Sequence, residues 1–496
     1  MPPVIAKGQT GTAYASALFV LGALVTVFAG AMLAPTLTAV MEGDRTTALA
    51  FAASSLGGAF VGGALMLAMQ GAQRPALMRE NIALLALAWL VLPFFCAFPL
   101  WASGLFKTYE DAIFLATSAL TTTGASLVVD LESAPRSFLL WRAELEWLGG
   151  YASLVMGATV LGALGTGGGE VQRSLLPLGD TGAVYERFVH IARGIGLVYL
   201  CVTLAGFVAL TFGGIPAFHS LCLSFSAIST GGFTTTNDGL GTFHAPIAEI
   251  AMALLMLYGA MNFVTHWAYW RSFRLRSYFN EPEFWLLLIM VALALALIGA
   301  SELPGTSALA GMRHATFYLF NAVSLVTTSG YWLGPQPDAS PAFIVGAIAI
   351  TLIGGASVST AGGVKLMRTW LLMSQVRNEL RRLAFPRSLV RIKFRGINLE
   401  PGVIIGVWAL FISYVVTLAV TALVMGALGV DLLSSIVASV SAIANAGPLY
   451  DLLRGGAGGY DALPEGARWL LCGTMIAGRL EVLALLSLFS PAFWRQ

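Results

Sequence analysis

Residues 118–124 read SALTTTG, a run of small and polar residues in a chain that is otherwise mostly apolar. Threonine and glycine are poor helix formers, so this run predicts the end of a helix. Similar strips return three times: SAISTGG ends at Gly232, SLVTTSG ends at Gly330 and SAIANAG ends at Gly447. An internal repeat of this kind predicts that the chain is built from four similar units.

Each strip follows a short, partly apolar segment of about a dozen residues, which is too short to cross a bilayer and is typical of a re-entrant helix. These segments are 109–120, 216–228, 312–326 and 431–443. Longer apolar segments surround them, and we predict that each longer one spans the membrane. The ten predicted spans are 14–35, 47–69, 81–103, 137–165, 188–212, 247–270, 284–300, 341–372, 402–428 and 468–490.

The composition also indicates a membrane protein with several spans. Of the 496 residues, 57% are hydrophobic and 10% are charged, and the mean hydropathy is +0.80. A soluble domain carries about 25% charged residues. The net charge of +2 gives no indication of nucleic-acid binding. The apolar run 14–35 is longer than the core of a signal peptide, so we predict a retained first helix. The four cysteines lack metal-ligand spacing and are predicted to be buried apolar residues.

These patterns predict an all-α polytopic membrane protein. Four pseudosymmetric repeats, each a helix, a pore helix, a filter strip and a helix, surround one pore, and an extra N-terminal helix pair precedes them. The predicted boundaries are 1–75 for the helix pair, then 76–180, 181–278, 279–396 and 397–496 for the four repeats.

The basic residues predict the orientation in the membrane. Nine Lys and Arg residues lie between 365 and 395, and Arg271, Arg274 and Arg276 mark an equivalent connection one repeat earlier. Connections rich in Lys and Arg stay in the cytoplasm, so the strips enter from the opposite face. The acids that follow the strips are then predicted to face outward: Asp130, Glu132, Asp238, Asp338 and Asp451.

The strips have the chemistry of an ion filter. Backbone carbonyl oxygens can replace the water shell of an ion, and non-helical backbone at membrane depth requires such a polar setting. No strip contains a carboxylate, and neutral oxygens favour a monovalent cation over a divalent one. Ordinary turns or helix-packing motifs are the alternative, and the fourfold recurrence favours the filter. The candidate filter residues, with K⁺ as the bound metal ion, are Thr122, Thr123, Gly124, Thr230, Gly231, Gly232, Thr328, Ser329, Gly330, Asn445, Ala446 and Gly447.

A second glycine-rich stretch, GGASVSTAGGVK at 354–365, interrupts a predicted span. Such a run breaks or loosens a helix. It fits either a close helix crossing or a flexible intramembrane loop beneath the filter. Lys365 either holds the loop by pairing with a carboxylate or carbonyls, or is the first cytoplasmic anchor. The candidate gate residues are Gly354, Gly355, Gly362, Gly363, Lys365 and Arg479.

Arg479 and Glu481 are predicted to lie within the last apolar helix, where ionisable groups face a cavity or a partner. Two residues apart, they point to different faces and are not expected to pair. Arg479 either faces the pore or forms a structural ion pair with Glu144 or Glu146 of another helix.

Two polar residues in GAMNFVTHWAYW, Asn262 and His266, are predicted to share one helix face. They fit a packing network, and His266 fits a pH sensor as the alternative.

In these motifs the sequence resembles the Trk/Ktr/HKT superfamily of potassium transporters, most closely the TrkH-type membrane subunit. The resemblance covers nearly the whole chain, and the extra N-terminal helix pair fits the TrkH type. The motifs that carry it are TTTGAS (121–126), WLGG (147–150), STGGFTT (229–235), TTSGY (327–331), GGASVSTAGGVKLMR (354–368), ANAGP (444–448) and GRLEVLALLSLFSPAFWR (478–495). Glu144 and Glu146 depart from the more neutral residues expected before WLGG.

The resemblance implies K⁺ selection by the four strip glycines, because relatives with serine at the first such position tend to pass Na⁺ and this chain has Gly124 there. It implies a gating loop at 354–365 and an Arg479 that points into the pore. It also implies a homodimer in the cytoplasmic membrane of a prokaryote, with separate cytoplasmic nucleotide-binding regulatory subunits. The basic segment 365–395 is a candidate docking surface for them, and anionic lipid is an equally simple partner. No covalent cofactor is expected.

The sequence is compatible with four classes of function to different degrees. K⁺ uptake through a filter, passive or ion-coupled, is the leading hypothesis. A secondary transporter for another monovalent cation or a small solute is expected to show inverted repeats rather than four same-direction units. A membrane enzyme is disfavoured because the chain has no H-E-x-x-H, G-x-S-x-G or P-loop motif. The pore subunit of a potassium-pumping complex remains an alternative that co-purified partners would distinguish.

Overall fold

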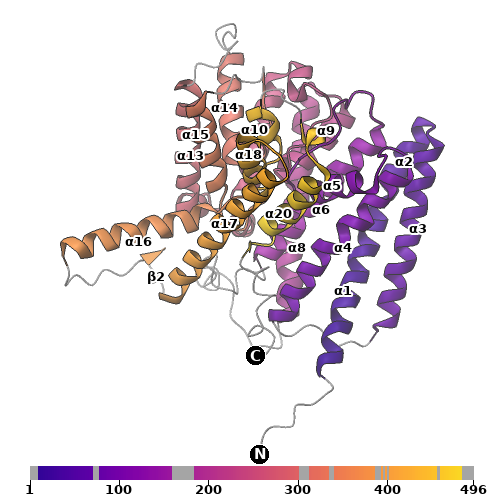
Figure 1. Ribbon diagram of the computed structural model, residues 1–496, viewed down its shortest axis with the longest axis horizontal. Coiled ribbons are helices and arrows are strands. Elements are labelled where there is room, and N and C mark those ends of the chain that lie inside the picture. The colour runs from indigo at the N-terminus through magenta and orange to yellow at the C-terminus, as the bar shows by residue number, and fades with distance from the viewer. Residues whose placement is uncertain are drawn as a thin grey trace, which may run out of the picture.

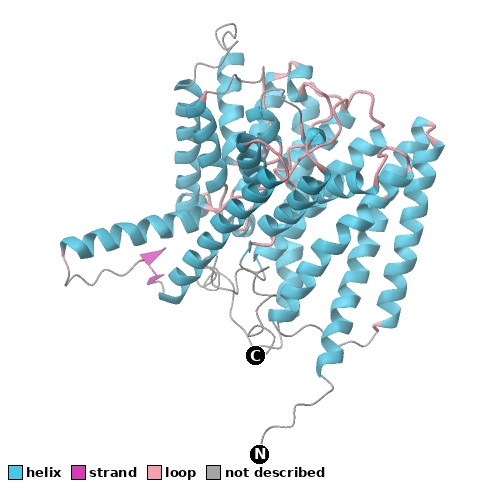
Figure 2. Ribbon diagram, in the orientation of Figure 1, coloured by secondary structure: helices cyan, strands magenta, loops and turns pink. Residues whose placement is uncertain are grey.

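The structure, a computed structural model, describes residues 9–70, 78–158, 184–300, 312–334, 340–385, 393–394, 397–398, 401–454 and 459–482. Over these ranges the chain forms helices joined by loops, together with one antiparallel pair of very short strands, β1 (Lys393–Phe394) and β2 (Ile397–Asn398) (Figures 1 and 2). The predicted all-α membrane fold is confirmed. The predicted repeat boundaries stay a prediction.

Six helices within the described ranges are long and apolar enough to cross a bilayer. They are α1 (Gln9–Ala31) continued by α2 (Leu33–Glu42), α3 (Arg45–Ala68), α4 (Met78–Ala102), α8 (Val184–Phe212), α13 (Pro282–Ala300) and α17 (Pro401–Ala427). Each coincides with a predicted span. Their outward surfaces carry large apolar side chains such as Leu56, Phe60 and Leu423, as expected of lipid-facing helices.

The predicted span 247–270 is not one helix, which corrects the prediction. It divides into α10 (Pro246–Ala260) and α11 (Phe263–Ser272), which meet at 101°. The break falls at Met261 and Asn262, where the side chain of Asn262 accepts a hydrogen bond from the Val264 amide and so caps α11. A capping side chain of this kind starts a new helix rather than continuing the old one.

Two other predicted spans are also interrupted. Segment 341–372 forms α15 (Pro341–Ile353) and α16 (Leu366–Ala384), separated by the glycine-rich loop. The described part of the last predicted span, up to residue 482, forms α20 (Glu465–Arg479), which ends at Arg479. Residues 483–490 of that span lie outside the described residues. Glu481 follows it with a φ of 58°, so the prediction that Glu481 lies within the helix is wrong. A left-handed residue cannot belong to a right-handed helix.

The four short segments form helices almost as predicted. They are α5 (Tyr109–Leu120), α9 (Ala217–Ile228), α14 (Met312–Val326) and α18 (Leu432–Ile443). Thr108 and Asp431 cap the first and last of them by accepting backbone N–H groups with their side chains. The C-terminal parts of all four are buried within the bundle.

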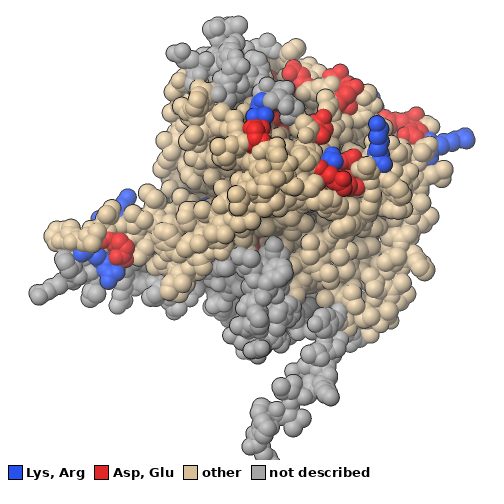
Figure 3. Space-filling view, in the orientation of Figure 1, with Lys and Arg blue, Asp and Glu red and all other residues tan. Residues whose placement is uncertain are grey.

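The remaining elements connect and support the bundle. They are α6 (Arg136–Met156), η3 (Gly239–Phe243), α12 (Arg276–Phe279), α19 (Pro448–Arg454) and η5 (Tyr460–Ala462). In Figure 3 acidic side chains gather at the upper end of the bundle with several Lys and Arg among them, and a mostly basic group lies on α16 at the left. The basic group on α16 agrees with the predicted orientation; Asp338 lies outside the described residues.

Candidate functional site

The four pore helices end in the same way. In each strip the amide before the final glycine donates to the carbonyl of the serine that opens the motif, five residues earlier. Such a bond closes a helix of the Schellman type, and the repeated serine marks its acceptor. The four bonds are Thr123 to Ser118 (2.8 Å), Gly231 to Ser226 (2.9 Å), Ser329 to Ser324 (3.1 Å) and Ala446 to Ser441 (2.8 Å).

The residue that turns each strip away from its helix has left-handed backbone. The φ angles are 53° at Thr122, 53° at Thr230, 58° at Thr328 and 50° at Asn445. For a residue other than glycine this conformation costs about 1–3 kcal/mol, and such strain concentrates at functional sites. Its recurrence at the same place in four strips is a strong indication that the strips share one task.

The strips meet one another in a closed ring. A Cβ placed on Gly124 would collide with the Gly231 carbonyl oxygen of the second strip, and one on Gly232 would collide with the Ser329 carbonyl oxygen of the third. The third strip approaches the fourth, because a Cβ on Gly330 would lie 2.9 Å from Cδ of Pro448. The fourth returns to the first, since the Gly447 amide donates to the Thr123 carbonyl at 2.5 Å. Glycine is required wherever two backbones approach this closely.

The WLGG motif brings α6 against the ends of two pore helices. A Cβ on Gly149 would collide with the Leu120 carbonyl oxygen at the end of α5. One on Gly150 would lie 2.8 Å from Cβ of Ser229, just after α9. The two glycines therefore let α6 pack directly behind the first and second strips.

The loop 354–365 lies directly against the inner ends of three pore helices. Thr360 Oγ1 lies 3.0 Å from the Ile228 carbonyl oxygen and 2.9 Å from that of Gly259. The Gly362 amide donates to Thr328 Oγ1 at 2.7 Å, and a Cβ on Gly362 would collide with the Ala444 carbonyl oxygen. The loop is thus joined to the strips rather than to lipid.

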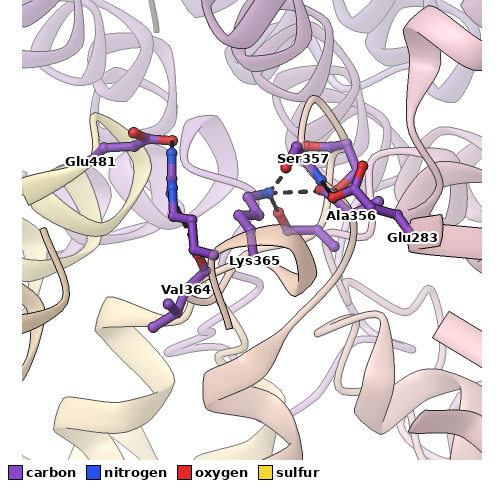
Figure 4. A network of polar contacts seen from close by, with 9 residues as sticks. Glu283, Ala356, Ser357, Val364, Lys365 and Glu481 are labelled. Atoms are coloured by element: carbon purple, nitrogen blue, oxygen red, sulfur yellow. Dashed lines mark hydrogen bonds and ion pairs between the residues drawn. The ribbon is translucent and has the colours of Figure 1, made fainter. Parts of the chain in front are cut away.

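The broken helix α10–α11 and Glu283 hold the other side of this loop. The Phe263 amide donates to the Val358 carbonyl at 3.0 Å, and the Ala356 amide donates to the Ala260 carbonyl at 2.9 Å. The buried carboxylate of Glu283 accepts the Ser357 amide at 2.7 Å (Figure 4). The side chain of Asn262 donates to the same carboxylate at 3.1 Å. The backbone groups freed by the helix break thereby find partners in the loop.

Lys365 is the last residue of the loop, and its side chain points back into the loop (Figure 4). Its Nζ donates to the Ala361 carbonyl and lies 3.4 Å from the Ser359 carbonyl oxygen. Glu481 forms an ion pair of 2.6 Å with Arg368, at the start of α16. The end of α20 and the helix after the loop are therefore tied together.

Arg479 is buried and reaches the same loop from α20. Its Nη1 donates to the Thr360 carbonyl at 2.8 Å, and its Nε donates to Ser153 Oγ at 2.5 Å. It makes no contact with Glu481 in the described structure, in agreement with their spacing. The Arg479 guanidinium therefore lies directly against the loop, at the Thr360 carbonyl.

Asn262 and His266 take part in different contacts. Asn262 caps α11, whereas His266 stacks on Tyr258 with ring centroids 3.6 Å apart. The ring nitrogens of His266 lie 2.9 Å from the Tyr278 hydroxyl and 3.0 Å from the Tyr258 carbonyl oxygen. Both nitrogens have partners, which favours the packing network.

The outer face carries acids with contrasting surroundings. The Asn237 side chain donates to Asp130 at 3.1 Å and lowers the pKa of that carboxyl. Burial, together with the charge of nearby Asp461, raises the pKa of Asp451 to about 7. Asp451 therefore titrates close to neutral pH, whereas Asp130 remains charged.

Sequence reasoning missed several residues at this site. Glu283, which anchors the loop, is an ionisable residue near the start of a span, and that was the available signal. The partners of Glu481 and Arg479 lie 113 and 119 positions away, and no local pattern indicates them. The same is true of the contacts that join Phe233 to Arg142 and Tyr331.

Comparison with known proteins identifies the family. The profile of the TrkH family, described as a cation transport protein, matches residues 49–496. The chain belongs to the TrkH family. The family consists of transport proteins rather than enzymes, and this TrkH-family chain is a multi-pass inner-membrane protein.

Individual relatives cover almost the whole TrkH-family chain. The Trk system potassium uptake protein TrkH of Halomonas elongata is 32% identical over 97% of this chain and 99% of its own. The TrkH of Escherichia coli K12 is 32% identical over 96% of this chain and 98% of its own. The crystal structure of the potassium transporter TrkH from Vibrio parahaemolyticus matches with a TM-score of 0.86 and 29% identity, covering 97% of this chain and all of that one.

Proposed function

We propose that the protein takes up K⁺ across the cytoplasmic membrane through a filter made by its four strips. The names of the relatives, which are potassium uptake proteins, support K⁺ as the transported ion. The observation that carries the proposal is the closed ring: each strip leaves its pore helix through the same left-handed turn and touches the next strip. Neutral backbone and hydroxyl oxygens gathered in this way suit a monovalent cation.

The test is transport by the purified chain in liposomes. Fluxes of K⁺, Rb⁺ and Na⁺ are measured side by side under the same gradient. The proposal expects K⁺ and Rb⁺ to pass and Na⁺ to pass far more slowly, because the oxygen ring replaces the hydration shell of the larger ions. Equal K⁺ and Na⁺ fluxes would reject the filter, and transport of an organic solute would favour a secondary transporter.

The loop 354–365 is proposed to be the gate. Its contacts with Ile228, Thr328 and Arg479 are consistent with a segment that closes the path beneath the strips. Shortening the loop within 356–362 is expected to raise K⁺ flux, since fewer groups then obstruct the path. Flux that falls in a variant of normal folding and yield would reject the gate.

Two kinds of partner are proposed, a second copy of the chain and cytoplasmic nucleotide-binding subunits. Arg381 and Arg382 are exposed on α16 and provide a basic surface for the subunits. Charge reversal with Arg381→Glu and Arg382→Glu is expected to weaken co-purification at physiological salt. Undiminished co-purification would exclude this surface, whereas weaker binding to anionic vesicles would favour lipid as the partner.

A further inference from the structure

The second strip is held at its outward end by several buried side chains. Phe233 follows Gly232 there. Buried side chains contact its amide, its carbonyl and its ring. The ring is nearly fully buried, with 4% of its surface exposed. Its partners come from α6 and from the third strip, so two other parts of the molecule determine where this strip lies.

Glu146 of α6 binds the strip from behind. Its side chain has no exposed surface, and its Oε1 accepts the Phe233 amide at 3.3 Å. A Cβ on Gly231 would collide with the same carboxyl group, so the side chain lies directly against the strip backbone. A buried acceptor at this place fixes the amide that would otherwise have no partner.

Tyr331 binds the strip from the neighbouring repeat. It follows Gly330 of the third strip, and its hydroxyl lies 3.2 Å from the Phe233 carbonyl oxygen. The same hydroxyl bonds Ser226 Oγ, on the pore helix that leads into the second strip. One hydroxyl therefore joins the third strip, the second strip and the second pore helix.

Arg142 completes the arrangement. Its guanidinium lies over the Phe233 ring, 4.7 Å from the centroid, and donates to the Thr234 carbonyl. Arg142 and Glu146 are four residues apart, on one face of α6. The glycines of the WLGG motif, Gly149 and Gly150, lie one turn further along α6. They let this face of the helix pack closely against the strip.

We propose that Arg142, Glu146 and Tyr331 form a clamp on Phe233 that determines the cation specificity of the second strip. The inference rests on the proposed function as a K⁺ filter. None of the three side chains is proposed to touch the ion; they are positioning residues. Selection between cations of different size requires carbonyl oxygens at fixed positions, and the clamp restrains both peptide groups of Phe233. The Tyr331 hydroxyl also restrains the neighbouring third strip, which Tyr331 follows.

Tyr331→Phe is the first test, because it removes one hydroxyl and keeps the ring and the volume. A net hydrogen bond corresponds to a change of roughly 2- to 10-fold in an equilibrium. We expect the K⁺/Na⁺ permeability ratio in liposomes to fall by about that factor. Tyr414→Phe is the matched control: Tyr414 is also buried, and its hydroxyl has no hydrogen-bond partner in the described structure. Its ratio is expected to stay at the wild-type value.

Glu146 is tested by a pair of variants. Glu146→Met keeps the length of the side chain and removes both oxygens, so the permeability ratio is expected to fall. Glu146→Gln keeps an oxygen for the Phe233 amide and is expected to restore most of the ratio. Glu144→Met, two positions away and on another face of α6, is the control and is expected to leave the ratio unchanged.

The outcomes separate the clamp from the filter. If wild type selects K⁺ while Tyr331→Phe and Glu146→Met both transport with an unaltered ratio, the clamp is overturned and the filter stands. If Glu146→Met does not fold, Tyr331→Phe alone decides. A control that lowers the ratio as much as its partner would also overturn the clamp. If wild type itself does not select K⁺, the proposed function fails first.

Discussion

At the scale of single residues, the four strips combine two kinds of special backbone. Thr122, Thr230, Thr328 and Asn445 turn left-handed without being glycine, and three of the four following glycines, Gly124, Gly232 and Gly330, also have positive φ. A threonine adopts this conformation at a cost in strain, whereas the glycine permits contact with the next strip. The two residue types therefore have different tasks.

Gly124→Ser should lower K⁺ selectivity. The new Cβ would collide with the Gly231 carbonyl oxygen, and the backbone at Gly124 has a φ of 78°. Strain of about 1–3 kcal/mol must be relieved by displacing one strip, and 1.4 kcal/mol corresponds to a tenfold change in an equilibrium. We expect the K⁺/Na⁺ flux ratio to fall about tenfold.

A serine elsewhere provides the control for this variant. Gly299 lies in α13, and a Cβ there would have no neighbour within 4 Å. Gly299→Ser should retain the wild-type ratio. A Gly124→Ser protein with unchanged selectivity would remove the first strip from the filter.

Asp451 should make stability depend on pH. Its pKa in the folded protein is about 7, above the ordinary value of 3.8, so the folded state binds the proton more tightly. The proton therefore contributes to the free energy of unfolding. This contribution is fully present below pH 3.8 and is lost as the pH rises through about 7. The unfolding temperature of wild type should therefore fall over this interval relative to that of Asp451→Asn. The corresponding loss in the free energy of unfolding is at most about 4 kcal/mol.

Thermal unfolding in detergent from pH 4 to 8 checks this expectation. Glu132→Gln, which removes an exposed acid on the same outer surface, is the control and should follow wild type. Parallel pH curves for wild type and Asp451→Asn would show that Asp451 does not hold its proton in the folded protein.

At the scale of elements, two interrupted helices support each other. The break between α10 and α11 exposes backbone groups that bond the loop between α15 and α16, through the pairs Phe263–Val358 and Ala356–Ala260. Neither break is stable alone within a membrane, because unpaired backbone groups are costly there. Arg479 fixes the far side of the same loop through Thr360. The position of the proposed gate is therefore a joint property of these elements.

Arg479→Ala should raise K⁺ flux. A unit charge about 8 Å from a cation contributes about 2 kcal/mol at an effective dielectric constant of about 20. Removing the Arg479 charge lowers the electrostatic barrier to K⁺ and releases the Thr360 carbonyl. We therefore expect K⁺ flux to rise several-fold. Arg454→Ala, which removes a partly exposed ion pair with Asp431, is the control. Unchanged flux in Arg479→Ala would indicate a purely structural arginine.

At the scale of the whole molecule, α16 extends away from the bundle (Figure 1). One side of it carries exposed apolar residues: Met373, Val376, Leu380 and Leu383, with 43–80% of their surface exposed. The same helix carries Arg377, Glu379, Arg381 and Arg382, so it is too polar to lie within lipid. This apolar side suits the second chain of the proposed homodimer.

The double variant Leu380→Glu and Leu383→Glu should weaken that homodimer. Burying two carboxylates at an apolar contact costs several kcal/mol, enough to shift the oligomer at micromolar concentration. Light scattering in detergent should then report the mass of one chain. Asn378→Glu adds a charge to the opposite side of α16 and should leave the mass at that of the wild type. A double variant with the wild-type mass would exclude this contact.

The sequence by itself determined the class of fold, the four short helices and the position of the small, polar strips that follow them. Local preferences and hydrophobic length decide these features, and each is contained in a stretch of about 20 residues. It also placed Arg479 and loop 354–365 among the candidates, because charges and glycines stand out in an apolar chain.

Only the tertiary structure decided how these pieces are joined. The ion pair of Glu481 with Arg368 and the contacts of Glu146 and Tyr331 with Phe233 join residues far apart in the chain. The break at Met261–Asn262 likewise depends on bonds to the distant loop 354–365. A buried polar group must find a partner somewhere in the fold, but the sequence around it does not say where. Packing of the whole bundle therefore selects the contacts that the separate segments leave open.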